Sequence, residues 1–155
     1  MLFRSQVGAG ATVSGGGHIV GDLVSNGVLS PGNSPGRLVV SGDVTQMAGA
    51  ALLLDIDGPT PGLGAGHHDT LVLTGAGAVF TAGGTLKPIT RGVTGAATNT
   101  YTPAIGDRFE VVTAEGGVAG AFAQLVQPDA GLPENARFDV VYGTKIGRAS
   151  GRERV

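Results

Sequence analysis

The chain has 155 residues, of which 29 are glycine, none is cysteine or tryptophan, and only 5% are aromatic. This composition disfavours helices and favours short strands joined by tight turns, while an apolar content of 41% argues against a disordered chain. The formal net charge is −2, and residues 1–144, with six Lys/Arg and eleven Asp/Glu, carry −5, so we expect no basic surface for nucleic acid or anionic membrane.

The first ten residues, MLFRSQVGAG, lack the apolar core of a secretory signal. No stretch of the chain approaches the roughly 18 apolar residues of a transmembrane helix. We therefore expect any export signal of the parent protein to lie upstream of this sequence.

Short apolar runs separated by glycine follow one another along the chain. Each has the length of a β-strand, and no segment keeps helical periodicity beyond two turns. The sequence therefore predicts an all-β fold. The runs are residues 11–15, 18–29, 37–44, 50–58, 69–75, 78–80, 84–89, 107–117 and 136–143.

Three of these runs share one form, in which apolar residues are followed by Ser or Thr and then Gly: ATVSGGG from residue 11, LVVSGDV from residue 38 and LVLTGAG from residue 71. A recurrence of about 20 to 35 residues indicates a solenoid of stacked rungs. In a parallel β-helix, Leu38, Val40, Leu71 and Leu73 would point inward and stack. An antiparallel sandwich or jelly roll, with strands of similar spacing, is the alternative.

The stretch SPGNSPG at residues 30–36 contains GNSPG, which matches the G-x-S-x-G pattern of a hydrolase nucleophile at Ser34. That site needs a backbone N–H on the next residue and a helix after it. Pro35 has no N–H, and the β-rich run RLVV follows instead. We interpret the stretch as a structural corner between strands, formed by Gly32, Asn33 and Gly36.

The sequence divides into three parts. Residues 7–90 are expected to form β-helix rungs. Residues 91–144 begin with a long polar loop or hairpin and then carry most of the aromatic residues, so we expect a C-terminal cap in which Phe109 and Phe122 cover the end of the solenoid. Residues 146–155, IGRASGRERV, have no strand pattern and resemble translated sequencing-adaptor sequence, so we interpret them as a non-native tail outside the fold.

Several of these phrases occur together in a known family. They are GVLSPGNSPGRLVVSGDVTQ at residues 27–46, ALLLDIDG, HDTLVLTG at residues 68–75, GGTLKPI and GDRFEVVTAEGGVAGAF at residues 106–122. Their order is more specific than any single phrase. In this order, over about residues 15–143, the chain resembles the C-terminal passenger region of bacterial type V autotransporters and related outer-membrane adhesins.

The resemblance implies a right-handed parallel β-helix on the bacterial cell surface, secreted across the outer membrane. In the intact protein it implies a β-barrel translocator, absent from this chain, as the partner that follows. The section nearest that barrel would act as an autochaperone for the passenger. The resemblance also implies adhesion, with a host or biofilm surface ligand as a further partner.

Four sequence patterns could indicate a catalytic or ligand-binding site rather than a structural role. His67, His68 and Asp69 could ligate zinc, but neighbouring strand residues point to opposite faces, so we favour a loop in which Asp69 bonds its own turn. GAGHHD departs by one position from the calcium-binding nonapeptide and has no tandem copies. Gly62, Gly64 and Gly66 lack the Lys-Ser/Thr of a phosphate loop.

The fourth pattern is Asp55 and Asp57 in LLLDIDG, which share a strand face as the paired carboxylates of a glycosidase would. We favour an outward acidic face at the end of a strand. The sequence thus predicts a protein without catalytic, cofactor-binding or metal-binding residues, which acts as an autotransporter stalk. The alternatives are a polysaccharide-active β-helix enzyme using Asp55 and Asp57, and a secreted calcium-binding repeat protein.

Overall fold

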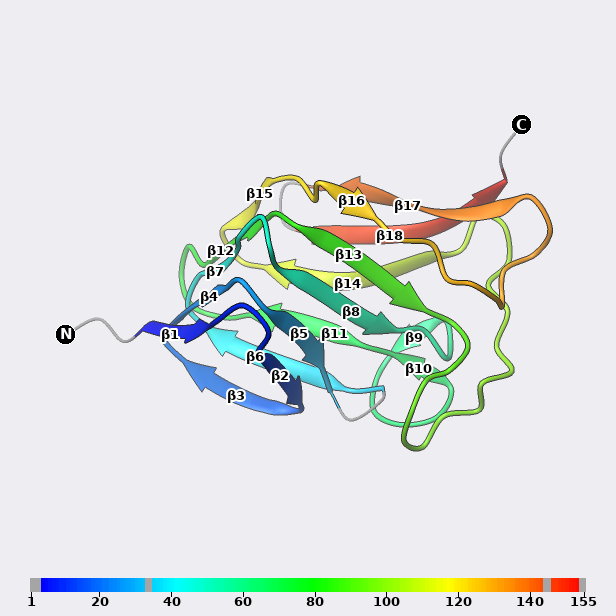
Figure 1. The fold of residues 1–155 in the computed structure, drawn as a ribbon, viewed down its shortest axis with the longest axis horizontal. Helices are drawn as coiled ribbons and strands as arrows, with labels where there is room; N and C mark the ends of the chain where they lie inside the picture. Colours follow the sequence, from blue (N-terminus) through cyan, green and yellow to red (C-terminus); the bar gives the residue numbers. More distant parts are fainter. Residues whose placement is uncertain (1–3, 33–34, 144–145, 154–155) are drawn as a thin grey trace.

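The computed structural model describes residues 4–32, 35–143 and 146–153, the last of these as backbone only. Within these ranges every regular element is a strand and no helix occurs, so the all-β prediction is confirmed (Figure 1). Sheet A contains β1 (Arg4–Val7), β4 (Asp22–Ser25), β7 (Val44–Gln46), β12 (Val79–Ala82) and β15 (Gly117–Gly120). Sheet B contains β2 (Thr12–Gly15), β5 (Val28–Pro31), β8 (Ala51–Asp55), β13 (Thr85–Ile89) and β16 (Gln124–Leu125).

Sheet C contains β3 (Gly17–Val20), β6 (Arg37–Ser41), β11 (Thr70–Leu73), β14 (Arg108–Ala114), β18 (Ile146–Glu153) and β17 (Ala136–Tyr142). A separate pair is formed by β9 (Thr60–Pro61) and β10 (His67–His68). Between β1 and β16 every ladder is parallel. The antiparallel sandwich that the sequence left open does not fit this pairing.

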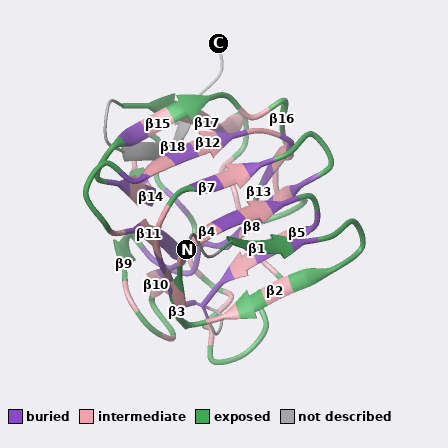
Figure 2. Ribbon diagram, turned by 90° about the vertical axis from the view of Figure 1, so that its left-hand side faces the viewer, coloured by how far each residue is buried: buried purple, intermediate pink, exposed green. Residues whose placement is uncertain are grey.

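Successive parts of the chain visit the three large sheets in the same order, B, then C, then A. Thus β2, β3 and β4 are followed by β5, β6 and β7, and each later strand pairs in parallel with its equivalent from the earlier set. In the end-on view of Figure 2, buried positions lie on the strands of the stacked sheets, whereas exposed positions gather in the connecting loops and in β1 and β2.

The pairing register places equivalent apolar side chains on top of one another. These ladders are Leu29, Leu52 and Leu86 in sheet B, Leu38, Leu71 and Val112 in sheet C, and Leu23, Val44 and Phe80 in sheet A. A further ladder of sheet C joins Val40 and Leu73. All of these side chains are buried, with 0 to 4% of their surface exposed. Because full burial of one Leu or Val contributes about 1.5–3 kcal/mol, the ladders form the core of the fold.

Two insertions interrupt the stacking, at residues 58–66 and at residues 90–107. The first carries β9 and leads into β10, and the second connects β13 to β14. The sequence left a loop or a hairpin open for the second, and the structure has no strand there. Because both insertions follow strands of sheet B, they gather at the same corner between sheets B and C.

The SPGNSPG corner joins β5 to β6. Gly32 has φ +83°, and a Cβ at this position would collide with the backbone of Gly36. This conformation and this close approach both require glycine. A strand rather than a helix follows Pro35, while Asn33 and Ser34 lie outside the described residues.

The sequence boundary at residues 90 and 91 falls inside the second insertion, and β14 and β15 then extend the same sheets as β11 and β12. Phe109 of β14 is fully buried, with Tyr101 and Phe138 at ring-centroid distances of 6.3 and 5.8 Å. Phe122 is half-buried between the rings of Phe80 and Tyr142.

The end of sheet C is antiparallel: β18 lies between β14 and β17. The sequence interpretation left residues 146–155 outside the fold, whereas the structure places residues 146–153 in this strand. Backbone pairing explains the difference, because an edge strand such as β14 offers N–H and C=O groups to any extended segment, whatever its side-chain pattern.

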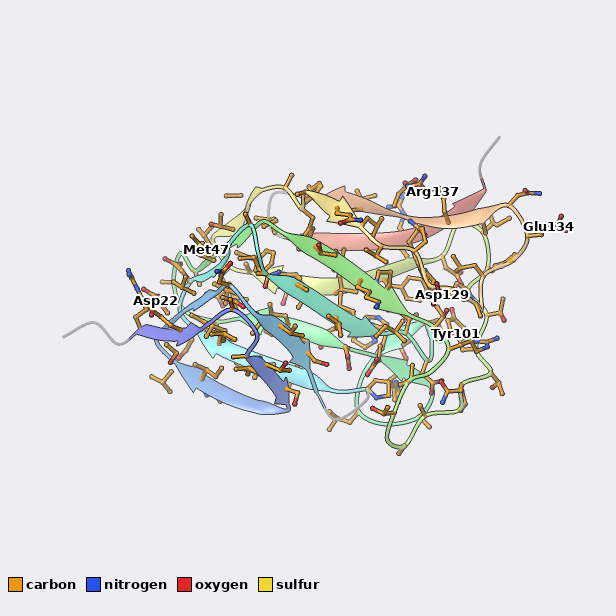
Figure 3. All side chains as sticks on the ribbon, viewed as in Figure 1. Asp22, Met47, Tyr101, Asp129, Glu134 and Arg137 are labelled. Atoms are coloured by element: carbon orange, nitrogen blue, oxygen red, sulfur yellow. The ribbon has the colours of Figure 1, made fainter. Side chains whose placement is uncertain are left out.

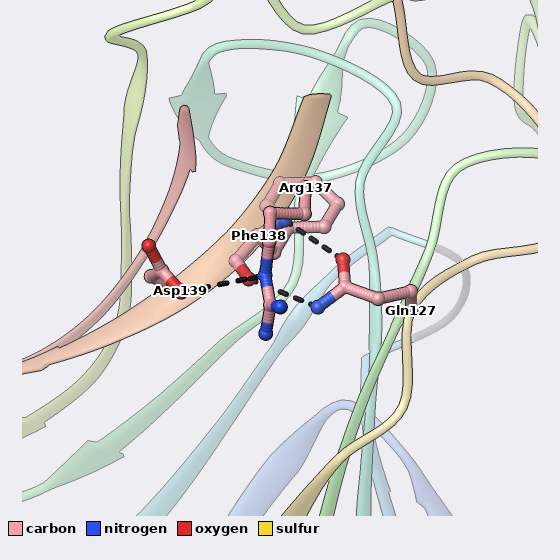
Figure 4. Close-up of polar contacts among 4 residues, drawn as sticks. All are labelled: Gln127, Arg137, Phe138 and Asp139. Carbon is pink, nitrogen blue, oxygen red and sulfur yellow. Dashed lines mark hydrogen bonds and ion pairs between the residues drawn. The ribbon is translucent and has the colours of Figure 1, made fainter. Parts of the chain in front are cut away.

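The outer edge of β17 is covered by a side chain. The Gln127 amide accepts a hydrogen bond from the N–H of Phe138 at 2.8 Å and donates one to its C=O at 2.9 Å (Figure 4). Beside it, Arg137 and Asp139 form an ion pair with a separation of 3.6 Å. Gln127 thus occupies the place that a neighbouring strand would take.

Leu71→Asp tests the core. An unpaired charge between Leu38 and Val112 has no compensating partner, so we expect a loss of at least about 4 kcal/mol of unfolding free energy and a melting temperature lower by at least about 8 °C. Val72→Asp, which changes the next residue on the outer face, is the matched control and should lower the melting temperature by much less. Equal melting temperatures for Leu71→Asp and the unmodified chain would contradict the inward assignment.

Candidate functional site

Four residues singled out in the sequence converge at the corner between sheets B and C. Asp55, Asp57, His68 and Asp69, together called the acidic corner, have exposed fractions of 7%, 1%, 0% and 0%. The expectation of an outward acidic face at Asp55 and Asp57 is therefore wrong. Both residues are covered because β8 ends under the two insertions, with a further bridge between Ile56 and His68.

The Asp57 carboxylate holds both insertions. It accepts hydrogen bonds from the N–H of Gly66 at 2.9 Å, from the N–H and hydroxyl of Thr98 at 2.9 and 2.7 Å, and from the N–H of Asn99 at 2.9 Å. Burial pushes the pKa of Asp57 upward, but the hydrogen bonds from Thr98, Gly66 and Asn99 outweigh it and hold the pKa below its usual value. Asp57 is therefore an ionised structural anchor.

The Asp69 carboxylate joins the acidic corner to the SPGNSPG corner. It accepts hydrogen bonds from the N–H of Gly36, 33 residues earlier, at 2.7 Å and from the N–H of Asp55 at 2.9 Å. The expected bond to its own turn is thus replaced by bonds to two neighbouring segments. Burial, helped by the charge of Asp55, raises the pKa of Asp69 to about 7 against the opposing effect of the two N–H donors.

His68 is the aromatic member of the acidic corner. Its Nδ1–H donates to the Asp69 carbonyl oxygen at 3.0 Å, an assignment that follows because a carbonyl can only accept. Its Nε2 has no hydrogen-bond partner within the described part of the chain. The ring meets Phe109 edge to face with a centroid distance of 5.6 Å. Burial lowers the pKa of His68, so the ring is neutral at physiological pH.

The neighbouring His67 points away, toward Thr60, whose Oγ1 lies 3.2 Å from its Nδ1. This is the alternation that strand geometry requires, and it separates the two imidazoles. His18 lies in β3, exposed and away from both. Within residues 4–32 and 35–143, no group of three or more His, Asp and Glu side chains is arranged to hold a metal ion.

The glycine-rich stretch of the first insertion uses its N–H groups internally. Gly64 donates to the carbonyl oxygen of Pro35 at 2.9 Å, and Gly66 donates to Asp57. Both glycines have positive φ, +78° and +83°. These N–H groups are therefore committed to shaping the loop and cannot form a phosphate cradle.

Sequence reasoning missed the residues that organise the second insertion. The Arg91 guanidinium donates to the carbonyl oxygens of Thr100 and Tyr101 and to the hydroxyl of Thr102 at 3.0 Å. Tyr101, seen at the insertion end of the molecule in Figure 3, donates its hydroxyl to Asp107 at 3.0 Å. The sequence signal that could have revealed this role is a single Arg, Arg91, within a long uncharged run. In such a run the five N–H donors of its guanidinium can bond only to backbone and hydroxyl oxygens.

Taken together, the acidic corner is a set of buried, hydrogen-bonded groups that fasten three loops. No known protein family matches the chain, and comparison with curated proteins and with solved structures found no match. In the part of the chain that the structure describes, no helix is long and apolar enough to cross a membrane.

Asp69 and His68 give the stability opposite dependences on pH. Above the ordinary aspartate pKa of 3.8 the unfolded chain releases the Asp69 proton, whereas the folded chain keeps it. The contribution of Asp69 to the unfolding free energy is therefore fully present at low pH and is lost as the pH rises to about 7. His68 has a folded pKa below the ordinary histidine value of 6.5, so its contribution is present above that pH and lost as the pH falls. Below the ordinary histidine pKa of 6.5 the two effects therefore act in opposite directions.

Single variants separate the two effects. Just below pH 6.5, unfolding free energy should fall with pH in His68→Gln and rise with pH in Asp69→Asn, with slopes up to about 1.4 kcal/mol per pH unit. Urea unfolding at several pH values measures both, and the unmodified chain should lie between them. Slopes of the same sign in the two variants would be inconsistent with a buried neutral His68 beside a protonated Asp69.

Proposed function

We propose that the chain folds as a right-handed parallel β-helix and serves as a non-catalytic stalk segment in the passenger of a bacterial autotransporter. The observation that carries the proposal is the repeated B, C, A order of parallel strands with apolar ladders in register. Right-handed winding is the expected form, because nearly all crossovers between parallel strands have that hand.

Stacking supplies the mechanical part of this function. Each rung adds about 4.8 Å along the stack, so a continued stack carries distal regions away from a membrane without needing a large globular core. A chain that folds as it emerges from the cell cannot slip back through a narrow pore. Folding therefore gives export a direction.

The C-terminal section has features that suit an autochaperone. Its Phe109 ring is met edge to face by the rings of Tyr101, Phe138 and His68, and such ring pairs contribute about 0.5–1.5 kcal/mol each beyond their buried area. A well-packed terminal section offers a formed edge for the next strand. The partner in this proposal is the β-barrel translocator of the same protein, with location on the cell surface and adhesion as the function of the whole.

The acidic corner supports a non-catalytic role. A glycosidase needs one carboxylic acid and one carboxylate facing the substrate. Here Asp57 is 1% exposed, with its two oxygens accepting four hydrogen bonds, and Asp55 is 7% exposed. Both carboxyl groups are thus covered by the surrounding chain, which does not suit contact with a sugar chain.

A surface-display experiment tests the proposal. The chain is placed between an export signal with an epitope tag and an autotransporter β-barrel in a Gram-negative host. We expect antibody labelling of intact cells for the unmodified chain and for Val72→Asp, and labelling reduced several-fold for Leu71→Asp at equal levels of assembled barrel. Display that does not depend on Leu71 would contradict a role of folding in export.

The two rival functions have their own measurements. Incubation with acidic and neutral polysaccharides should release no new reducing ends, and millimolar calcium should leave the melting temperature unchanged. Glycan cleavage that is lost in the Asp55→Asn, Asp57→Asn double variant while the fold remains would establish the enzyme instead. A calcium-dependent rise in melting temperature would favour the repeat-protein alternative.

A further inference from the structure

Two adjoining hollows lie on the outer face of sheet C, beneath the first insertion. One has a volume of about 400 Å³ between Pro61 and Leu63 of the insertion and the strands β11 and β14. The other has about 450 Å³ between Gly64 and the strands β3 and β6. Arg37 and Leu63 line both, so the two hollows form one surface feature that crosses four strands, called here the β6 groove.

The roof of the β6 groove is held in place. Gly64 bonds Pro35 at one side, Gly66 bonds Asp57 at the base, and Thr60 contacts His67 across the loop. Leu63 stands at the tip between the hollows with 75% of its surface exposed. The groove is therefore formed before any ligand arrives, which reduces the ordering cost of binding.

Arg37 gives the groove its available charge. Its exposed guanidinium makes no hydrogen bond or ion pair with any described residue, although it stands between the two hollows. Glu110, at the far end of the first hollow, is already engaged in an interaction of its own. A carboxylate is the natural complement, because the planar guanidinium donates two parallel hydrogen bonds to it.

The rest of the lining suits a peptide. Pro61, Leu63, Val39 and Val72 present apolar surface, and Gly17 and Gly64 have open space where a side chain would stand, so a ligand can approach their backbone. In an extended peptide, side chains two positions apart lie on one side about 6.6–6.8 Å from each other. When an acidic residue of the bound peptide pairs with Arg37, the peptide residues two positions before and after it lie in the two hollows. Apolar side chains at those two positions would fill the hollows.

We propose that the β6 groove binds an extended acidic segment of another protein with the pattern apolar, any, acidic, any, apolar. Arg37 pairs with the acidic side chain, and Leu63 packs between the two apolar ones. This is a binding activity beyond the stalk, and it depends on the outer surface of sheet C rather than on export.

The test uses the full chain labelled with ¹⁵N and the acetylated, amidated peptide Leu-Thr-Glu-Thr-Leu. We expect the amide signals of Gly17, Val39 and Gly64 to shift with a Kd on the order of 1 mM or tighter, and the Gln-for-Glu peptide to bind at least about tenfold more weakly. Ionic strength of about 1 M should weaken only the Glu peptide. A trigalacturonate probe, which also carries carboxylates, should cause no shifts.

Three variants complete the test. Arg37→Gln should abolish the preference for Glu over Gln, Leu63→Ala should weaken both peptides, and Arg108→Gln, an exposed Arg of the same sheet outside the groove, should change neither. If Arg37→Gln lowers the melting temperature, Arg37→Lys replaces it and should lose part of the preference. Equal binding of both peptides, no shifts at all, or shifts with trigalacturonate alone would overturn the proposal.

Discussion

Stacking of apolar side chains in register between parallel strands is the interaction on which the whole structure depends. The backbone ladders fix which residues lie over one another, and a slip of β11 by one position against β6 would turn Leu71 and Leu73 outward together. The chain contains no cysteine, so disulfides cannot link the strands. Every other feature, including the two insertions and the outer surface of sheet C, is positioned by these ladders.

The acidic corner solves a problem that stacking alone leaves open. Insertions at residues 58–66 and 90–107 leave the ladders, and their backbone groups need partners elsewhere. Asp57 supplies these partners for Gly66, Thr98 and Asn99. One carboxylate just after β8 thereby holds two segments that are far apart in sequence.

Local patterns made the strands and their stacking predictable, because alternation and glycine spacing report on nearby residues. The burial of Asp55 and Asp57 was not predictable in this way. The donors that cover Asp57 come from up to 42 positions later in the chain, and nothing in LLLDIDG records them. Asp69 is similar, since its partner Gly36 precedes it by 33 positions. The strand at residues 146–153 pairs through its backbone with β14 and β17, and composition does not record such pairing.

The Gln127 amide on the edge of β17 has a consequence for behaviour in crowded solutions. A sheet edge grows when an incoming strand finds free N–H and C=O groups, and fibrillar aggregates extend by repeating that step. With both groups of Phe138 already bonded to Gln127, a second molecule finds no docking point in the middle of that edge. The Gln127 side chain thus blocks the addition of a further strand to β17 at Phe138.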